Sequence, residues 1–277
     1  MNKENKLIKK VKRLIRKAGL PRWLHKYGPK KYELWHHLIA LLVREFCKLS
    51  YRRVKQLFDL LGFLCPSKSA LQYNAKKIPA ALWQHLLTTT TSLQANVVAL
   101  DATTFTRSSP SFHYLHRIDR LKPVGKPVKL SILVNTKTKK ILAARLRSKA
   151  VGDCKDVKQL LKNIQAKTFV ADKGYDSEQV HEHLFNKGMK AHIPLRKNAR
   201  RGFFRMKASK HFNLRIYHRR EISESSFSSL KRKFGTSVKC RSARTQRAEM
   251  FCRLLLQNMI SLFKIRFRTQ PIFRITI

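Results

Sequence analysis

The chain has 277 residues, which is enough for one large domain and a smaller one. Its hydrophobic content of 43% excludes a disordered polycation, although 61 Lys+Arg against 15 Asp+Glu give a formal net charge of +46. A surface this positive attracts polyanions, so nucleic acid is the expected partner. Charge alone leaves open a ribosomal-type RNA binder and a protein of the membrane surface.

The cysteines and the apolar stretches argue against secreted and membrane-spanning proteins. The five cysteines contain no C-x-x-C pair, so neither a disulfide framework nor a zinc site is indicated, and a reducing cytosol fits. The stretches 34–46 and 251–263 are shorter than the ~20 residues that a membrane span needs, and they are predicted to be buried helices. The N-terminus is Lys-rich and lacks the apolar core of a secretion signal.

The first part of the chain has helical periodicity. Residues 3–18 predict a basic amphipathic helix, and residues 31–49 predict a second helix with an apolar face. Ser50 and Ser67 can each cap a further helix, with Gly62 ending the first of these two. Residues 50–77 therefore predict a helix-turn-helix, although a plain helical hairpin has the same pattern.

In a helix-turn-helix the second helix lies in the major groove of DNA. The polar side chains near the start of that helix are then the candidate DNA contacts: Lys68, Gln72 and Lys76. The pattern changes after the Thr-rich run 88–92. We therefore expect an all-α, DNA-binding N-terminal domain of residues 1–95.

From residue 97 the pattern becomes that of an α/β domain, expected to cover residues 96–277. Strands are predicted at 97–100, 129–134, 141–146, 168–171 and 190–193, and helices at 153–164 and 177–187. The second and third strands form a hairpin, and the later strands alternate with helices. This order predicts a mixed sheet with helices on both faces.

Two acidic residues, Asp101 and Asp172, each directly follow a short apolar run and are expected at the ends of their strands. Open α/β sheets place their sites at such strand ends. Either residue alone is typical of a turn or a helix cap, but the pair in a DNA-binding chain favours a metal site. Mg²⁺ prefers carboxylate oxygens, and two such ions about 4 Å apart can promote in-line phosphoryl displacement.

Two further motifs make the sequence recognisable. Asp172-Lys173-Gly174-Tyr175-Asp176 resembles the second-aspartate signature of prokaryotic insertion-sequence DDE transposases. Downstream, Tyr217-x-x-Arg220-x-x-x-Glu224-x-x-x-x-x-x-Lys231 matches the spacing of the family's Y-R-E-K signature. The resemblance covers about residues 97–260.

This resemblance implies an RNase H-like fold with a mixed five-stranded sheet flanked by helices. It implies Mg²⁺-dependent cleavage at the ends of an insertion sequence and transfer of the 3′-hydroxyl into target DNA, with Mn²⁺ able to replace the two Mg²⁺ ions. The implied partners are double-stranded DNA, namely terminal inverted repeats and target, and a second copy of the chain; the implied location is the cytoplasm, at the nucleoid of a bacterium or archaeon. The implied metal ligands and catalytic residues are Asp101, Asp172 and Glu224, and the implied DNA contacts are Tyr217, Arg220 and Lys231.

Several alternatives stay open. Glu221 competes with Glu224, but the spacing to Arg220 and Lys231 favours Glu224. Asp153 and Asp156 stand near the family's loop between strands, and helix capping is the favoured explanation for both. The alternative functions are a transposase-derived DNA-binding repressor, an RNase H-like nuclease without strand transfer, and an RNA-binding structural protein.

Overall fold

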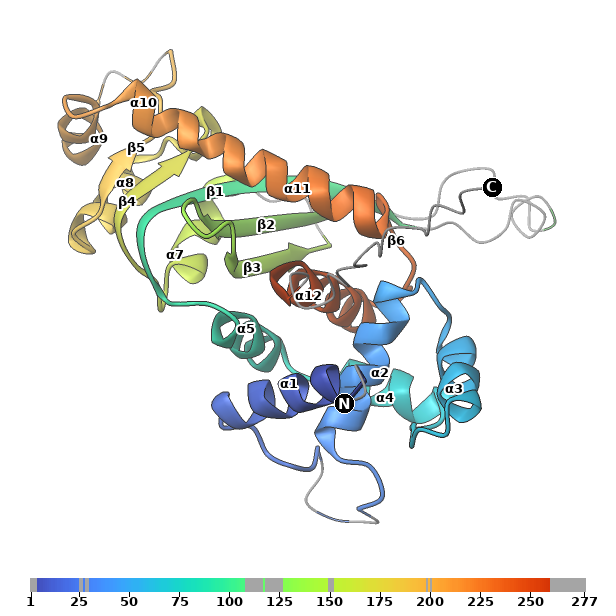
Figure 1. Ribbon diagram of the computed structural model, residues 1–277. Helices are drawn as coiled ribbons and strands as arrows, with labels where there is room; N and C mark the ends of the chain where they lie inside the picture. Colours follow the sequence, from blue (N-terminus) through green and yellow to red (C-terminus); the bar gives the residue numbers. More distant parts are fainter. Residues whose placement is uncertain are drawn as a thin grey trace, which may run out of the picture.

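In the computed structural model, the described residues are 4–24, 27, 30–107, 117, 127–148, 152–197, 199 and 201–259. Within them the chain forms a six-stranded sheet with helices on both faces (Figure 1). The strands are β1 (Gln94–Arg107), β2 (Val128–Asn135), β3 (Ile141–Arg147), β4 (Gln165–Ala171), β5 (Lys190–His192) and β6 (Ser237–Val238).

The order of the sheet is β3-β2-β1-β4-β5, with β6 paired to the far end of β1. The first three strands are antiparallel, whereas β4 and β5 run parallel to β1. This order, an antiparallel meander followed by two parallel strands, is that of an RNase H-like fold, as expected. The sixth strand was not predicted, because two residues are too short to give a periodic signal.

The helices within the described residues are of very different lengths. They are α1 (Glu4–Lys17), α2 (Leu34–Phe46), α3 (Tyr51–Leu60), α4 (Lys68–Lys77), α5 (Ala80–Thr89), α7 (Val157–Leu160), α8 (Glu178–Asn186), α9 (Phe203–Ser209), α10 (Leu214–Tyr217), α11 (Glu221–Phe234) and α12 (Ala243–Met259). None of them combines the length and the apolar character required to cross a bilayer. Residues 260–263 of one predicted buried helix lie outside the described part.

The two faces of the sheet bury different hydrophobic clusters. Leu133 and Phe169 belong to the cluster that α7 and α8 cover. Phe105 and Ile132 belong to the opposite cluster, which α11 and α12 cover. Because neighbouring residues of a strand point to opposite faces, a side chain's position along β1 determines which helices it meets.

The opposite cluster continues into the N-terminal helices. Val11 of α1, Leu38 of α2 and Trp83 of α5 are fully buried in the same cluster as Leu254 of α12. Figure 1 shows α12 between the sheet and these helices. The helical N-terminal part and the sheet therefore share one core through α12.

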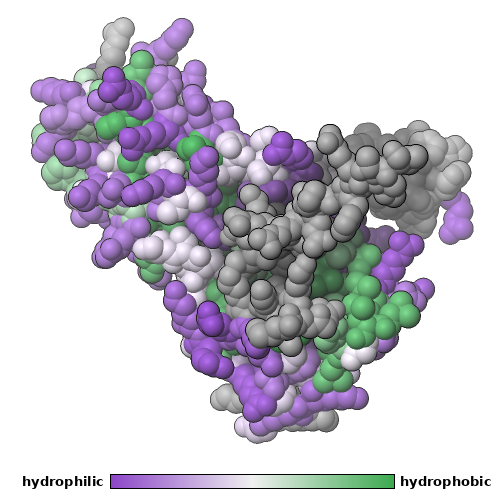
Figure 2. Space-filling view, viewed as in Figure 1, coloured by the Kyte–Doolittle hydropathy of each residue, from purple (hydrophilic) through white to green (hydrophobic). Residues whose placement is uncertain are grey.

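The predicted caps of the helix pair are confirmed. Ser50 Oγ accepts a hydrogen bond from the backbone N–H of Arg53 at 3.2 Å, and Ser67 Oγ accepts one from Ala70 at 3.2 Å. The surface of this region is mixed: Figure 2 shows hydrophilic residues over most of the visible face and an apolar group over α3. On α3, Leu60 is 86% exposed.

Two predicted elements differ from those observed. The strand expected at 97–100 continues to Arg107, because β2 pairs with β1 as far as Phe105 and β6 pairs with its last residues. The helix expected at 153–164 is a 3-10 turn at Asp153–Asp156 followed by the single turn α7. Its apolar residues are buried, but the segment is too short for a full helix.

Candidate active site

Asp101 lies inside β1 rather than at its end, so that prediction is wrong. The parallel pairing of β1 with β4 stops at Leu100 and Ala171, whereas the antiparallel pairing with β2 continues past Asp101. Leu100 points to the face covered by α7 and α8, so Asp101 points to the face covered by α11. The carboxylate therefore lies where one neighbouring strand has ended and the sheet opens.

Asp172 directly follows the last residue of β4, as predicted. Because Ala171 pairs with Leu100, Asp172 stands beside Asp101 on the neighbouring strand. The Asp172 carboxylate forms no hydrogen bond or ion pair with another residue of the described chain, which leaves its oxygens available to a ligand. Tyr175, one turn later, is buried, and burial raises the pKa of its hydroxyl.

Glu224 comes from the first turn of α11, which lies along the face to which Asp101 points. Two residues of this helix fix its position: Phe227 is buried in the core, and Lys231 Nζ donates a hydrogen bond to Thr103 Oγ1 at 2.8 Å. Thr103 lies two residues beyond Asp101 on the same face of β1. The helix therefore brings Glu224 toward the aspartates.

Arg220 joins two of the three carboxylates. Its Nη1 atom lies 3.6 Å from Asp101 Oδ2, and its Nη2 atom lies 2.5 Å from Glu224 Oε1. The guanidinium also lies over the Tyr217 ring, 5.9 Å from its centroid. Of the predicted site residues, Asp101, Glu224 and Tyr217 thus lie around Arg220. Asp172 lies beside Asp101 on the neighbouring strand, and Lys231 binds α11 to β1 two turns further along the helix.

The electrostatics of Asp101 reflect this crowding. Burial is the main cause that raises the pKa of its carboxyl, and the negative charges of Glu224 and Asp172 raise it further. A hydrogen bond from the Ala102 N–H and the charge of Arg220 oppose that shift. The site therefore carries an excess of negative charge that Arg220 offsets only in part.

The donor set suits a hard divalent cation, but it is open. Among the described residues no three acidic, His or Cys side chains stand close enough to enclose a metal ion. Glu224 is half exposed and turned toward Arg220. Mg²⁺ commonly takes only one or two protein carboxylates and completes its shell with water and substrate phosphate, so an open set of carboxylates is compatible with it.

The residues predicted to contact DNA through the helix pair lie apart from this site. Lys68, Gln72 and Lys76 are spaced four residues apart on α4, and all three are exposed. They therefore share one accessible face of the helix. Nothing in the fold covers that face among the described residues.

Helix capping is wrong for Asp156. Its buried carboxylate accepts hydrogen bonds from Ser131 Oγ at 2.9 Å and Arg147 Nε at 2.6 Å, and it makes no cap bond. Asp153 pairs with Lys129 of β2 instead of capping a helix. Both carboxylates join the turn before α7 to the neighbouring strands.

Two other acidic residues fix the basic segment after β5, and the sequence analysis gave neither a role. Buried Asp176 accepts from the backbone N–H of Arg196 at 2.9 Å and pairs with Arg205 Nε at 2.9 Å. Glu178 accepts from the first backbone N–H groups of α9. In the sequence, only the place of Asp176 at the end of the motif that begins with Asp172 could have indicated its role.

The RNase H-like sheet carries acidic residues within β1, directly after β4 and on the covering helix α11. Residues 92–259 match the transposase DDE domain family. The chain belongs to this family, whose members cut and join DNA and generally use divalent metal ions.

No curated protein matches the chain with significance. Among solved structures, a cryo-EM structure of the piggyBac transposase synaptic complex with hairpin DNA is similar at 12% sequence identity and a TM-score of 0.48. The similarity covers 92% of this chain and 72% of that one.

Proposed function

We propose that this transposase cuts DNA at the ends of an insertion sequence and joins the freed 3′-hydroxyl to target DNA, with Mg²⁺ as its cofactor. The observation that carries the proposal is that Arg220 forms ion pairs with both Asp101 and Glu224, while Asp172 directly follows the strand paired beside Asp101. The negative charges of Glu224 and Asp172 both raise the pKa of Asp101. A shared excess of carboxylate charge is what divalent cations relieve.

The roles follow from the positions. Asp101 and Asp172, side by side on neighbouring strands, would hold the cations, and Glu224 would complete the set. Bound Mg²⁺, in a pair of ions that Mn²⁺ can replace, would polarise the scissile phosphate and lower the pKa of the attacking water or hydroxyl. Arg220 offsets the carboxylate charge and, with Tyr217, lies where it could orient the scissile strand.

Lys231 is retained as a proposed DNA contact, as its place in the signature implies. Its bond to Thr103 also supports a role in holding α11, and thereby Glu224, over β1. We keep DNA contact as a proposal for the exposed side chains of α4, which would bind the terminal inverted repeats: Lys68, Gln72 and Lys76.

A homodimer is proposed, because the two ends of an element must be paired before both are joined. We expect it to act at the nucleoid of a bacterium or archaeon. Mass photometry of the complex with end DNA should detect two chains for two ends; one chain for each independently bound end would contradict the dimer.

A cutting and joining assay tests the function. DNA carrying the element's flanking ends is incubated with Mg²⁺ or EDTA and a supercoiled target. We expect cutting and joined products only with Mg²⁺. Asp101→Asn should lower cutting by roughly 10³-fold, which corresponds to about 4 kcal/mol of transition-state stabilisation, while end binding stays nearly unchanged.

The controls separate the alternatives. Glu221→Gln, one turn from Glu224 and 73% exposed at its side chain, should cut like the wild type. Equal cutting by Asp101→Asn and the wild type would refute the assignment. Cutting without joined products would identify a nuclease, and end binding by the wild type without cutting would identify a repressor.

A further inference from the structure

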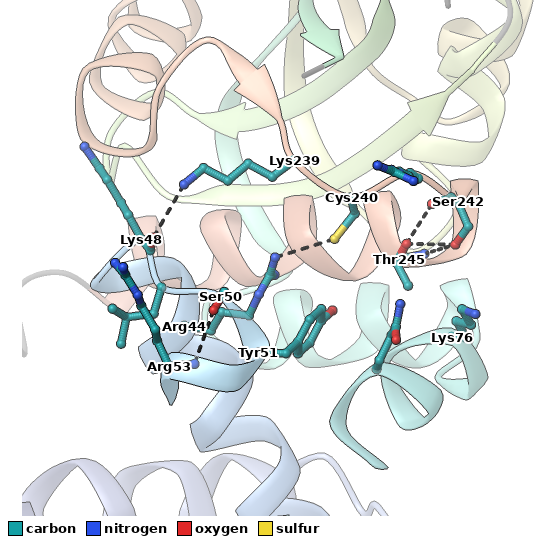
Figure 3. A pocket seen from close by; sticks show the side chains of 13 residues that line it. Arg44, Lys48, Ser50, Tyr51, Arg53, Lys76, Lys239, Cys240, Ser242 and Thr245 are labelled. Atoms are coloured by element: carbon teal, nitrogen blue, oxygen red, sulfur yellow. Dashed lines mark hydrogen bonds between the residues drawn. The ribbon is translucent and has the colours of Figure 1, made fainter. Parts of the chain in front are cut away.

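A groove of ≈ 710 Å³ lies between the N-terminal helices and the segment that leads from β6 into α12 (Figure 3). One wall comes from the end of α2 and from α3 and α4, and the other comes from residues 239–245. Among the described residues its lining contains no carboxylate but six cationic side chains: Arg44, Lys48, Arg53, Lys76, Lys239 and Arg241.

The positive charge of the groove is largely uncompensated. None of the carboxylates in the described ranges forms a salt bridge with Lys48, Arg53, Lys76 or Arg241, whereas several other arginines of the chain are paired. Like charges on two facing walls repel one another, and a polyanion between the walls removes that repulsion. The groove therefore favours a ligand with several negative charges.

Arg44 at the base of the groove provides a second, independent observation. Its side chain is only 8% exposed and stacks over the Tyr51 ring, 4.2 Å from the centroid. One guanidinium nitrogen donates to Glu45 and another lies 3.6 Å from Cys240 Sγ, but the buried Nε has no hydrogen-bond partner within the described chain. A buried donor left without an acceptor is uncommon in folded proteins, so Arg44 retains capacity to donate to a ligand in the groove.

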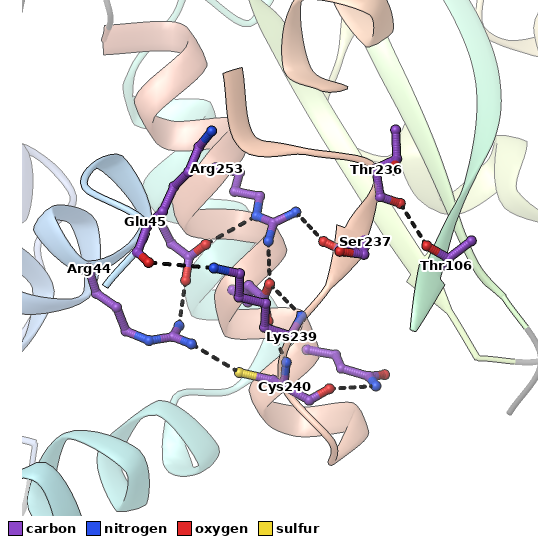
Figure 4. Close-up of polar contacts among 11 residues, drawn as sticks. Arg44, Glu45, Thr106, Thr236, Ser237, Lys239, Cys240 and Arg253 are labelled. Atoms are coloured by element: carbon purple, nitrogen blue, oxygen red, sulfur yellow. Dashed lines mark hydrogen bonds and ion pairs between the residues drawn. The ribbon is translucent and has the colours of Figure 1, made fainter. Parts of the chain in front are cut away.

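The wall from residue 239 onward is held rigidly. The buried carboxylate of Glu249 accepts from the backbone N–H groups of Lys239 at 2.9 Å and Cys240 at 2.8 Å. Arg253, paired with Glu249 and Glu45, donates to the Ser237 carbonyl at 2.9 Å (Figure 4). These bonds fix the wall against both α2 and α12, so the two walls keep their separation.

The shape of the groove favours duplex DNA over a small anion. Gln72 and Lys76 line it and also belong to the exposed face of α4, so the groove is continuous with that face. Across it, α12 begins beside Ser242 and Thr245, and the N-terminus of a helix adds partial positive charge. A duplex lying along α4 would bring a run of phosphates between the walls.

We propose that this groove binds the phosphate backbone of duplex DNA, with Arg53 and Lys76 on one wall and Arg241 on the other. The site lies apart from the proposed catalytic carboxylates. Its two walls come from the helical N-terminal part and from the catalytic domain, so one stretch of DNA would contact both. Residues 239–245 thereby become DNA contacts within the catalytic domain, in addition to those on α4.

Binding of a short fluorescein-labelled duplex of mixed sequence, followed by anisotropy over a series of KCl concentrations in EDTA, tests the proposal. The triple variant Arg53→Gln, Lys76→Gln, Arg241→Gln is compared with the matched control Lys158→Gln, Lys167→Gln, Lys190→Gln. Both variants lose the same charge, and the three control lysines are exposed on α7, β4 and β5, which do not line the groove.

We expect the groove variant to bind roughly tenfold or more weakly, with the slope of log affinity against log salt reduced by about 2 to 3, since each lost phosphate contact removes about 0.9. The control should stay close to the wild type. Equal losses in both variants would overturn the proposal, as would an unchanged slope in a groove variant that circular dichroism shows to be folded. EDTA prevents cutting, so this outcome is independent of the catalytic assignment.

Discussion

At the scale of single residues, the carboxylates of the site repel one another, and Arg220 opposes this repulsion. Asp101 is held on a buried strand with two carboxylates nearby, and among the described residues Arg220 alone forms an ion pair with Asp101. Such an arrangement raises the free energy of the ionised protein, because each charge has lost part of its hydration. It is the expected state of a site built to receive cations.

The pKa of Asp101 leads to a prediction about stability. Because burial and neighbouring carboxylates raise this pKa in the folded protein, folding favours the protonated form. Its contribution to stability is fully present below the unfolded value of about 3.9 and is lost as pH rises through the higher folded pKa. Without metal, Asp101→Asn should therefore gain in melting temperature relative to the wild type as pH rises from about 4.

Thermal denaturation in EDTA at a series of pH values measures this difference. Glu182→Gln, an exposed position on α8, is the control and should show no such trend. A melting-temperature difference between Asp101→Asn and the wild type that does not change with pH would contradict the raised pKa.

At the scale of elements, helices that are far apart in sequence are joined by buried ion pairs. Glu45 of α2, Glu249 and Arg253 are all nearly inaccessible, and Arg253 Nε lies 3.1 Å from Glu45 Oε2. Burial is the main cause that raises the pKa of Glu45, which the arginines oppose. A buried network of this kind specifies one arrangement of the two helices rather than adding much net stability.

Breaking this network should be costly. Glu249→Ala leaves Arg253 without one of its carboxylates and leaves the N–H groups of Lys239 and Cys240 without an acceptor. We expect the free energy of unfolding to fall by about 3–5 kcal/mol, as is usual when one partner of a buried pair is removed. Urea denaturation of the wild type and the variant measures this fall in the free energy of unfolding.

The matched control is Glu182→Ala on the exposed side of α8, which should change the free energy of unfolding by no more than about 0.5 kcal/mol. If both substitutions had the same small effect, the carboxylate of Glu249 would not hold the segment after β6.

Hydrophobic periodicity predicted the helices and strands that are long enough to show a clear pattern. The amphipathic patterns of α2 and α3 and the apolar runs of β2 and β4 were predicted with small errors in their ends. The extension of β1 past Asp101 was missed, because the segment 102–107 is Thr-rich, has Phe105 as its one large apolar side chain and is held by pairing with β2 and β6. Tertiary pairing decides such segments.

For the candidate site, spacing was a good guide to which residues meet but not to how they interact. The register of the signature around Glu224 predicted that α11 would present it to the aspartates. The bond from Lys231 to Thr103 depends on how α11 packs on β1, which no local pattern shows. The roles of Asp156 and Asp176 depend in the same way on partners distant in sequence.

At the scale of the whole molecule, one hydrophobic core connects the N-terminal helices with the sheet. The cluster beneath α11 includes residues of α1, α2, α5 and α12, so the N-terminal helices are not packed independently of the sheet. We retain residues 1–95 and 96–277 as a proposed functional division. A formal net charge of +46 favours binding along the phosphate backbone of DNA.

The most direct test of this account is metal binding by the three proposed ligands, Asp101, Asp172 and Glu224. Mn²⁺ binding is followed by electron paramagnetic resonance, with and without end DNA, for the wild type, Asp101→Asn, Asp172→Asn, Glu224→Gln and the neighbouring control Glu221→Gln. We predict that the wild type and Glu221→Gln bind Mn²⁺ and that each of the other three substitutions weakens binding at least ~10-fold, a loss of about 1.4 kcal/mol. Undiminished binding by Asp101→Asn or Asp172→Asn, or a loss at Glu221 with none at Glu224, would contradict the assigned site.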